Sequence, residues 1–265
     1  MDVDAARHHY EDVLGLIPTH QDASSNVYWK GWDERDKYSV VVSPADRAGM
    51  NHVAYKVGHD ADLDEFQTRI ADYGIDVEEV PPGHLECCGC ALCFQLPSEP
   101  QMYLDTETEC VGKAVGTTNP APWPDGLKGC GVHWLDHVLL IGELNPEQGI
   151  NKGAESTAFV REVLDVRLVE QVMVGPDQSI QAATWLARTT TPHDIAFVGG
   201  PHMGFHHCAF FLEEWGDVLK AADVMAKHHV KIDVTPNATG SPAGIPSISL
   251  IPRATGMKPL RVWAI

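Results

Sequence analysis

The stretch GMNHVAYKVGHDADLDEFQTRIADYGIDVEEVPPG, residues 49–83, decides the fold, because the chain repeats its pattern. The repeat is GFHHCAFFLEEWGDVLKAADVMAKHHVKIDVTPN, residues 204–237. Both begin with Gly-x-x-His-x-Ala-aromatic and alternate apolar with polar residues, which predicts a strand. Apolar spacings of three and four then predict a helix. Each copy continues to Ile-Asp-Val, which we interpret as a short strand, so one strand–helix–strand module occurs twice.

A second matched helix precedes each copy of the module. HYEDVLGL, residues 9–16, corresponds to FVREVLDV, residues 159–166. A repeat of more than about a hundred residues is too long for a solenoid. It predicts an α+β fold of two tandem domains, each built from paired βαβββ modules. We place these domains at residues 1–115 and 132–265, joined by a Pro/Gly-rich linker at 116–131.

The two halves differ at their beginnings. In the second half, the predicted strand GVHWLDHVLLIG, residues 131–142, places His137 26 residues before Val163. The same offset from Val13, the counterpart of Val163, falls before residue 1. We therefore expect the first domain to lack its opening strand, which leaves one edge of its sheet unpaired.

Composition excludes several classes of partner. The chain has 265 residues and a formal net charge of −18, so it would repel nucleic acid phosphates. No apolar run reaches the roughly 18 residues that a membrane span needs. The acidic N-terminus does not resemble a signal peptide. We expect a cytoplasmic protein with neither nucleic acid nor membrane as partner, whose seven cysteines are free thiols.

The segment CCGCALC, residues 87–93, raises the question of a metal site, because Cys90 and Cys93 form a CxxC pair. A zinc site would need a second pair nearby. Cys110 and Cys130 are too far apart in the sequence to supply one. We interpret the cluster as strand and turn cysteines that pack as small hydrophobic residues.

Three histidines are the candidate functional residues. His137 lies in HWLDHVLL, residues 133–140, where alternation alone would favour a hydrophobic side chain, and His207 holds the matching place in its own strand. His193 precedes the predicted strand DIAFV in TPHDIAFV. A single strand histidine is more often a core residue with its hydrogen bonds satisfied. Two at corresponding module positions indicate a function.

The motifs HWLDHVLL, TPHDIAFV, GFHHCAFFLEEWGDVLKAAD and DGLKG resemble the extradiol ring-cleavage dioxygenases of the catechol 2,3-dioxygenase type, in the vicinal oxygen chelate superfamily. The likeness extends from about residue 5 to Pro236. It implies a glyoxalase-like fold and meta cleavage of catechol or alkylcatechols with O2, yielding 2-hydroxymuconic semialdehydes in aromatic catabolism. It assigns His137 and His207 as metal ligands and His193 as the residue that hydrogen-bonds substrate or oxygen.

The resemblance also implies one Fe(II) held by two histidines and a glutamate, which leaves three positions for catechol and O2. Mn(II) accepts the same ligands. A homotetramer is implied as well. His206 adjoins His207 on a strand and should therefore face the opposite way. We interpret the other conspicuous histidines as structural: His52, His133, His202, His206, His228 and His229.

The end of the chain departs from the family pattern. The resemblance implies a His-bearing turn, a strand ending in Tyr and the ligand Glu after Pro236, yet residues 234–265 contain five prolines and no Asp or Glu. A shifted reading frame recovers them: ATG for Met257 followed by the AA of Lys258 gives GAA, a Glu codon. With permissible codons, Pro246 onward reads Thr-Ile-Tyr-Phe-Phe-Asp-Pro-Ser-Gly-Asn-Arg-Asn-Glu-Thr.

We therefore interpret the chain as truncated at its N-terminus and frameshifted after about Pro236. The tail at residues 237–265 should be atypical, with the closing strands of the second domain disrupted, because proline deletes ladder hydrogen bonds. Without the ligand Glu we expect weak Fe(II) binding and slow or absent turnover. Two other hypotheses remain: an inactive remnant or binding protein of the same fold, and a glyoxalase-like metal-dependent isomerase.

Overall fold

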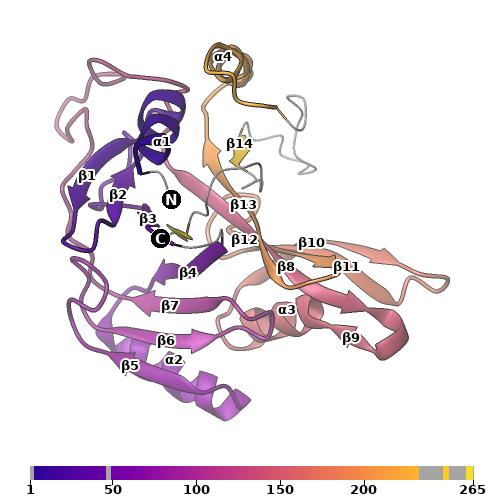
Figure 1. Cartoon of the computed structure of the whole chain (residues 1–265). Coiled ribbons are helices and arrows are strands. Elements are labelled where there is room, and N and C mark those ends of the chain that lie inside the picture. Colours follow the sequence, from indigo (N-terminus) through magenta and orange to yellow (C-terminus); the bar gives the residue numbers. More distant parts are fainter. Residues whose placement is uncertain (1–2, 46–48, 233–246, 251–260, 265) are drawn as a thin grey trace. The chain divides into compact units, whose positions relative to one another are not determined.

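The computed structural model describes residues 3–45, 49–232, 247–250 and 261–264 (Figure 1). Its helices are α1 (Val3–Arg7), the π-helical turn η1 (His8–Leu14), α2 (Asp60–Tyr73), the 3-10 turn η2 (Pro146–Gln148), α3 (Lys152–Glu162) and α4 (Trp215–Lys227). Its strands are β1 (Ile17–Gln21), β2 (Val27–Lys30), β3 (Val40–Ser43), β4 (Gly49–Lys56), β5 (Val77–Val80), β6 (Ala91–Gln95), β7 (Gln101–Asp105), β8 (Leu135–Asn145), β9 (Ile150–Asn151), β10 (Arg167–Val174), β11 (Ile180–Ala187), β12 (Ile195–Gly200), β13 (Gly204–Phe211), β14 (Ser247–Leu250) and β15 (Arg261–Ala264). The predicted α+β class is confirmed.

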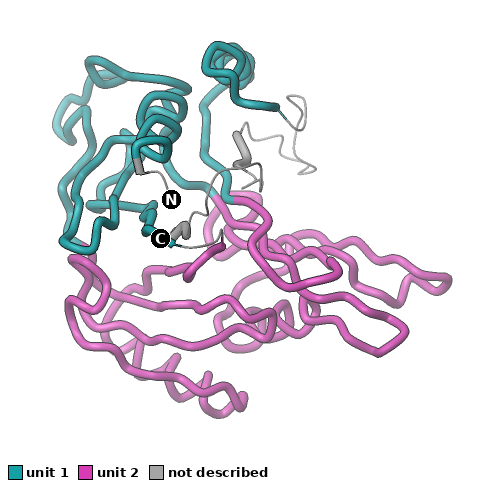
Figure 2. The backbone as a smooth tube through the Cα atoms, in the orientation of Figure 1, with its two compact units in different colours: residues 1–48, 109–136, 208–264 teal, residues 49–108, 137–207, 265 magenta. Residues whose placement is uncertain are grey.

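The chain forms two compact units, each assembled from segments far apart in the sequence (Figure 2). One unit contains residues 1–48, 109–136 and 208–264, and the other contains residues 49–108 and 137–207. Residues that bear on one site can therefore come from distant parts of the sequence. The tandem boundaries expected from the repeat remain a prediction.

The module that begins at residue 49 contributes four neighbouring strands, in the order β4-β7-β6-β5, to a larger sheet. Its first strand, β4, pairs in parallel with its last, β7, through His52 opposite Gln101. Antiparallel pairing continues from β7 to β6 and from β6 to β5. Between β4 and β5 runs α2, which buries Leu63 and Ile70, two of the apolar positions that predicted it. The strand–helix–strand reading of this stretch is confirmed.

The module that begins at β8 has the same pairing. β8 is followed by α3, and β10, β11 and β12 are joined by antiparallel ladders. β12 returns to pair in parallel with β8, through Ile195 opposite Val138. A parallel bond between first and last strands needs a crossover connection, and the helix with its following hairpin supplies it. The chain therefore contains the βαβββ pattern in two complete copies.

The two complete modules share one core within the unit of residues 49–108 and 137–207. Phe159 on α3 is fully buried. Its ring lies 5.6 Å from that of Phe94 on β6 and 5.3 Å from that of Tyr73 on α2, measured between ring centroids. Aromatic pairs at this separation add to the stabilisation that burial of their area gives. The helix predicted from FVREVLDV thus provides the anchor between the modules, although it ends at Glu162, earlier than the motif suggests.

The two described strands of the tail pair differently from the modules. β13 is the first strand of the repeated stretch, and it pairs antiparallel with β14 through Cys208 opposite Leu250. In both complete modules the first strand instead has a parallel partner. Most of the tail at 237–265, including the expected site of disrupted strands, lies outside the described residues.

β15 corrects the expectation of an unpaired sheet edge in the first half. It pairs antiparallel with β3, through Val262 opposite Val42, while β2 holds the other side of β3. An exposed edge presents a row of N–H and C=O groups to any extended segment. The last strand of the chain satisfies these groups.

Gly142 marks the closest approach between β8 and α3. A Cβ atom at this position would lie 2.6 Å from the Cα of Gly153 and closer still to its amide nitrogen. Backbone atoms cannot move aside as the end of a flexible side chain can. Glycine is therefore required where the helix crosses the strand that carries His137.

We expect Gly142→Ala to lower the free energy of unfolding by about 1–3 kcal/mol, the usual cost of overpacking a core. The measurement is the urea midpoint of unfolding. Gly216→Ala on α4 is the matched control, since a Cβ there meets nothing within 4 Å. Alanine should be neutral or stabilising at that helical position. Equal urea midpoints for Gly142→Ala and the parent would contradict the close approach.

Candidate metal centre and its second histidine layer

His137 and His193 meet because β8 and β12 run in parallel. Ile195, at the start of β12, lies opposite Val138, so the residues that precede them are neighbours. The two imidazole centroids are 4.0 Å apart, with the ring planes tilted by 50°. Both side chains are buried, with relative exposures of 4% for His137 and 6% for His193. Two histidines from well-separated parts of the sequence thus share one buried place.

His207 completes the group from β13, which lies next to β8 in the sheet. Its ring centroid is 5.6 Å from that of His137, in an edge-on arrangement with an interplanar angle of 71°. Burial lowers the pKa of His207 to about 3, and repulsion from His137, His206 and His193 acts in the same direction. A neutral imidazole is the form that binds a metal ion. The structure therefore brings together all three histidines singled out in the sequence.

A hydrogen-bonded loop fixes the position of His193. The Asp194 carboxylate accepts the backbone N–H of Arg188 at 2.6 Å and that of Thr189 at 3.0 Å. It also accepts the hydroxyls of Thr189 at 2.7 Å and Thr191 at 3.0 Å. Asp and Thr side chains stabilise turns by bonding to nearby backbone in this way. The run TTTPHD, residues 189–194, carries this turn signal, which strand and helix periodicity do not reveal.

Tyr55 on β4 also contacts this loop. Its hydroxyl donates to the backbone carbonyl of Asp194 at 3.1 Å. Burial raises the pKa of Tyr55 well above its usual value, and the charge of Asp194 adds to the shift. The phenol therefore stays protonated and remains a donor. The first complete module thereby supports the loop that holds His193 in the second.

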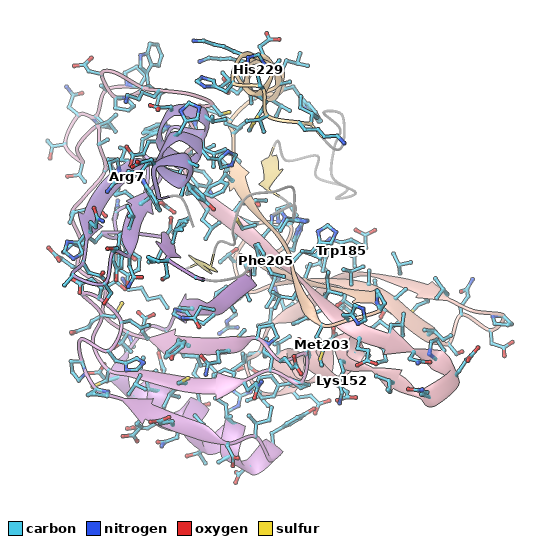
Figure 3. The ribbon with its side chains drawn as sticks, in the orientation of Figure 1. Arg7, Lys152, Trp185, Met203, Phe205 and His229 are labelled. Carbon is cyan, nitrogen blue, oxygen red and sulfur yellow. The ribbon has the colours of Figure 1, made fainter. Side chains whose placement is uncertain are left out.

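His206 is not separated from the site in the way that strand alternation predicted. Its Nδ1 atom lies 2.7 Å from Nδ1 of His207, and the ring centroids are 4.9 Å apart. The prediction that His206 faces away from His207 is therefore wrong for the imidazole ring, because its Nδ1 edge is turned toward His207. Nδ1 is the ring nitrogen nearest the backbone, so adjacent imidazoles can turn these edges together even where their Cβ atoms diverge. Figure 3 shows Phe205, the residue before His206 on β13.

The residues present fit part of a metal site. His137 and His207 bring two imidazole rings together from adjacent strands. Within residues 3–45, 49–232 and the two tail strands, no group of three or more His, Cys, Asp or Glu side chains is arranged to hold a metal ion. The sequence from 234 to 265 contains no Asp or Glu. A metal centre built on these two histidines would therefore need at least one further ligand that the described residues do not bring to it.

His52, the counterpart of His207 in the first module, has different neighbours. Its ring lies 4.5 Å from that of Tyr103 on β7, between centroids, and it is only 2% exposed. The Tyr103 hydroxyl is 3.4 Å from Nε2 of His84. Burial lowers the pKa of His52 to about 3, with a contribution from His84. The ring next to His52 is therefore that of Tyr103, whereas the ring next to His207 is that of His137.

Replacing His52 should flatten the dependence of stability on pH. Unfolded His52 takes up a proton below about pH 6.5, whereas the folded side chain does so only near its pKa of about 3. The contribution of His52 to the free energy of unfolding is therefore complete above the unfolded pKa of about 6.5. It decreases as the pH falls from there toward the folded pKa of about 3. His52→Gln should reduce the slope of unfolding free energy by up to about 1.4 kcal/mol per pH unit in this window. Urea unfolding at a series of pH values measures it.

The control for that measurement is His202→Gln, at an exposed position between β12 and β13. Its slope should match that of the parent, because the substitution removes a histidine from an exposed position and leaves the buried His52 in place. If the slope of unfolding free energy against pH for His52→Gln also equals that of the parent, the buried His52 ring takes up no proton on unfolding.

The remaining sequence expectations concern cysteines and membrane spans. All seven cysteines lie in the described residues as thiols rather than in disulfides, including the four of residues 87–93. Cys88 is buried and Cys90 is exposed, and neither takes part in a described metal cluster. In the described part of the chain, no helix has the length and apolar character needed to cross a membrane.

Two family models match the chain. Residues 50–109 match the catechol 2,3-dioxygenase-like N-terminal domain. Residues 134–245 match the glyoxalase/bleomycin resistance protein/dioxygenase superfamily. The matched ranges contain His52 in the first case and His137, His193 and His207 in the second. Both halves of the chain are thereby assigned to the same group of proteins.

Relatives and solved structures agree with these matches. Metapyrocatechase of Pseudomonas sp. (strain CF600) is 37% identical over 242 residues, which cover 91% of this chain and 76% of that protein. The crystal structure of the 2,3-dioxygenase LapB from Pseudomonas sp. KL28 has a TM-score of 0.86 at 34% identity, covering 100% of this chain and 88% of that one. Manganese-dependent 2,3-dihydroxybiphenyl 1,2-dioxygenase of Geobacillus genomosp. 3 is 23% identical, over 85% of this chain and 70% of its own. With His137, His193 and His207 converging within the range of the second family model, the chain belongs to the catechol 2,3-dioxygenase family of extradiol ring-cleavage enzymes.

Proposed function

We propose that this protein binds a catechol or alkylcatechol together with O2 and cleaves the ring beside the diol, at a metal held by His137 and His207. One observation carries the proposal: the rings of His137, His193 and His207 converge, with centroids 4.0 Å and 5.6 Å apart around His137. The similarity to metapyrocatechase, at 37% identity, supports the choice of substrate.

For the metal we propose Fe(II), with Mn(II) as the alternative that the similarity to a manganese-dependent relative raises. Both ions accept two histidines and one carboxylate. A bound metal would supply the positive charge that favours the deprotonated diol and would bring diol and O2 side by side. His137 and His207 would hold it through nitrogen lone pairs of their imidazole rings.

His193 would handle a proton during the reaction. Its ring is buried against His137, within reach of groups that bind beside that ligand. A positioned imidazole that moves a proton in the transition state typically contributes about 10²–10⁴-fold to the rate. The Asp194 loop holds the ring in place, so little reorientation is needed when substrate binds.

A binding protein without turnover is the second candidate, and the sequence favours it specifically. Residues 234–265 offer no carboxylate for the third ligand position, although the family pattern expects a glutamate there. Two nitrogen donors leave the charge of a divalent ion largely uncompensated. We therefore propose that the chain in this form binds Fe(II) weakly and turns over slowly or not at all.

The test separates these functions in one preparation. The protein is loaded anaerobically with Fe(II), mixed with catechol and exposed to air, and the yellow ring-fission product is followed by absorbance. Slow product formation supports the enzyme, and calorimetric binding of catechol without product supports the binding protein. Failure to bind catechol in the presence of Fe(II) would contradict both. Isomerisation of a glutathione hemithioacetal instead would favour the glyoxalase-like alternative.

The oligomeric state belongs to the same proposal. The family resemblance suggests a homotetramer, and we propose a homo-oligomer whose assembly is weakened by the altered tail. Light scattering coupled to size-exclusion chromatography measures the mass in solution. A stable tetramer at low protein concentration would contradict the weakening.

A further inference from the structure

The strand β10 combines exposed apolar side chains with a position at the end of a sheet. In the described part of the chain it is the last strand of its sheet, with β11 as its neighbour. An edge strand presents backbone N–H and C=O groups to any extended segment. Three valines on β10 are well exposed: Val169 at 50%, Val172 at 41% and Val174 at 41%. Figure 1 shows the β10–β11 hairpin extending past the other elements of its unit.

Two edge strands of the other sheet carry features that oppose pairing. β1 contains Pro18, which has no N–H to donate. β5 exposes Glu78 and Glu79, whose charges would repel those of a second copy. β10 contains neither proline nor lysine, and the charges of its Arg167 and Glu170 cancel. In a chain with a net charge of −18, two copies can therefore approach each other at β10 with little repulsion.

The sequence of β10, RLVEQVMV, is complementary to itself when two copies run antiparallel. If a two-fold axis lies between Glu170 and Gln171, each residue faces its mirror position across that point. Val169 then faces Val172 of the second copy, and Glu170 faces the amide of Gln171. Apolar residues meet apolar residues, and a carboxylate meets a hydrogen-bond donor. Because each copy uses the same edge once, the contact closes at two copies.

The two irregularities in the β10–β11 ladder lie on either side of this axis. One falls between Leu168 and Glu170, and the other between Val172 and Met173. Bulges increase the local twist of a strand and interrupt its pairing. The self-pairing should therefore be short and centred on the regular part of β10.

The side chain of Gln171 is oriented in a way that suits this contact. Its Oε1 atom accepts a hydrogen bond from Nε2 of Gln181 on β11, at 2.9 Å. An amide that accepts through its oxygen still has its NH2 group as a donor. That NH2 group is what the carboxylate of Glu170 on a second copy needs.

We propose that β10 is a self-association surface, where a second copy of this chain pairs antiparallel through residues 167–174 and covers the exposed valines. The inference deepens the proposed homo-oligomer by naming its surface, and it does not depend on the metal or on catalysis. One short strand gives a smaller contact than the roughly 1,200–2,000 Å² of stable interfaces. We therefore expect a weak dimer, with a dissociation constant of about 1–100 μM.

The first experiment measures dimerisation of the metal-free chain by sedimentation equilibrium over a series of concentrations. Val172→Lys should raise the dissociation constant by about 3–30-fold, because the two-fold axis makes it lose two cross-strand pairs at once. Leu219→Lys is the matched control, since Leu219 on α4 is 60% exposed and gains the same charge. It should leave the dissociation constant unchanged. Urea unfolding of each variant checks that the lysine has not altered the fold.

The second experiment uses opposite charges at one position. Gln171→Lys should lower the dissociation constant by about 2–10-fold and Gln171→Glu should raise it by a similar factor. The reason is that the new side chain faces Glu170 of the second copy, which attracts lysine and repels glutamate. Leu219→Lys and Leu219→Glu show how much the change in net charge alone contributes. Equal effects at positions 171 and 219 would overturn the proposed register.

The outcomes separate this inference from the proposed homo-oligomer. An oligomer that responds to none of the β10 variants would keep the homo-oligomer and overturn β10 as its surface. A parent that stays monomeric up to about 1 mM would overturn both. A peptide of residues 167–174 should dissociate the parent dimer, and a peptide of the same composition in scrambled order should not. Equal competition by both would overturn self-pairing and make β10 an edge that binds extended segments in general.

Discussion

Restoring the reading frame after Pro236 should tighten Fe(II) binding by about 100-fold or more, because even the loss of a partner behind a ligand costs about 10–100-fold. One base added just after the codon for Pro236 would replace the tail and encode a glutamate across Met257 and Lys258. A carboxylate would then join His137 and His207. Turnover of catechol should rise from slow or absent to the order of 10 s⁻¹, a common value for enzymes. Anaerobic titration and formation of the yellow product measure both quantities.

The matched control is the frame-restored chain with the new glutamate codon changed to alanine. It carries the restored closing segment but not the carboxylate. It therefore separates the effect of the glutamate as a metal ligand from the effect of the restored segment on folding. Its Fe(II) affinity should return toward that of the present chain. If this control binds Fe(II) and cleaves catechol as well as the restored chain, the missing glutamate is not what limits the protein. Sequencing the gene across the codons for Pro236 to Ile265 decides which tail occurs naturally.

His193→Phe in the frame-restored chain should lower kcat by about 10²–10⁴-fold, the range typical for loss of a positioned acid or base. Phenylalanine fills the buried space beside His137 but cannot exchange a proton. Fe(II) affinity should stay within a few-fold of the restored chain, since His193 is not proposed as a ligand. Steady-state turnover and anaerobic titration, performed on the same preparation, give the two numbers.

His202→Phe provides the control for a change from histidine to phenylalanine at an exposed site. It should leave kcat unchanged. Two outcomes would remove His193 from the mechanism: turnover within a few-fold of the restored chain, or a loss of Fe(II) affinity as large as the loss of kcat. The second outcome would make His193 a ligand in its own right.

The sequence predicted the parts of the fold that repeat. Gly49 and Gly204 open two strands with the same motif, and the strand–helix–strand order after residue 49 is what the structure contains. His137 and His207 were linked because they hold corresponding places in their modules, and the structure puts their rings 5.6 Å apart. Repetition made these features readable, since each copy supports the interpretation of the other.

Features that depend on tertiary neighbours were not readable in the same way. Strand alternation places successive Cβ atoms on opposite faces, but it does not describe ring edges, and so it missed the contact between His206 and His207. The pairing of β15 with β3 joins the two ends of the chain and follows no local pattern. The Asp194 loop was readable from its threonines and aspartate, but its importance depends on His193 lying against His137.

The central proposal is that His137 and His207 hold one metal ion, and that residues 234–265, which contain no Asp or Glu, supply no side-chain carboxylate to it. Anaerobic Fe(II) titration of the chain as it stands, beside His137→Leu and His207→Leu, tests it most directly. The account predicts one weak site per chain that either substitution abolishes. A single tight site in the parent, or a site that survives both substitutions, would contradict it.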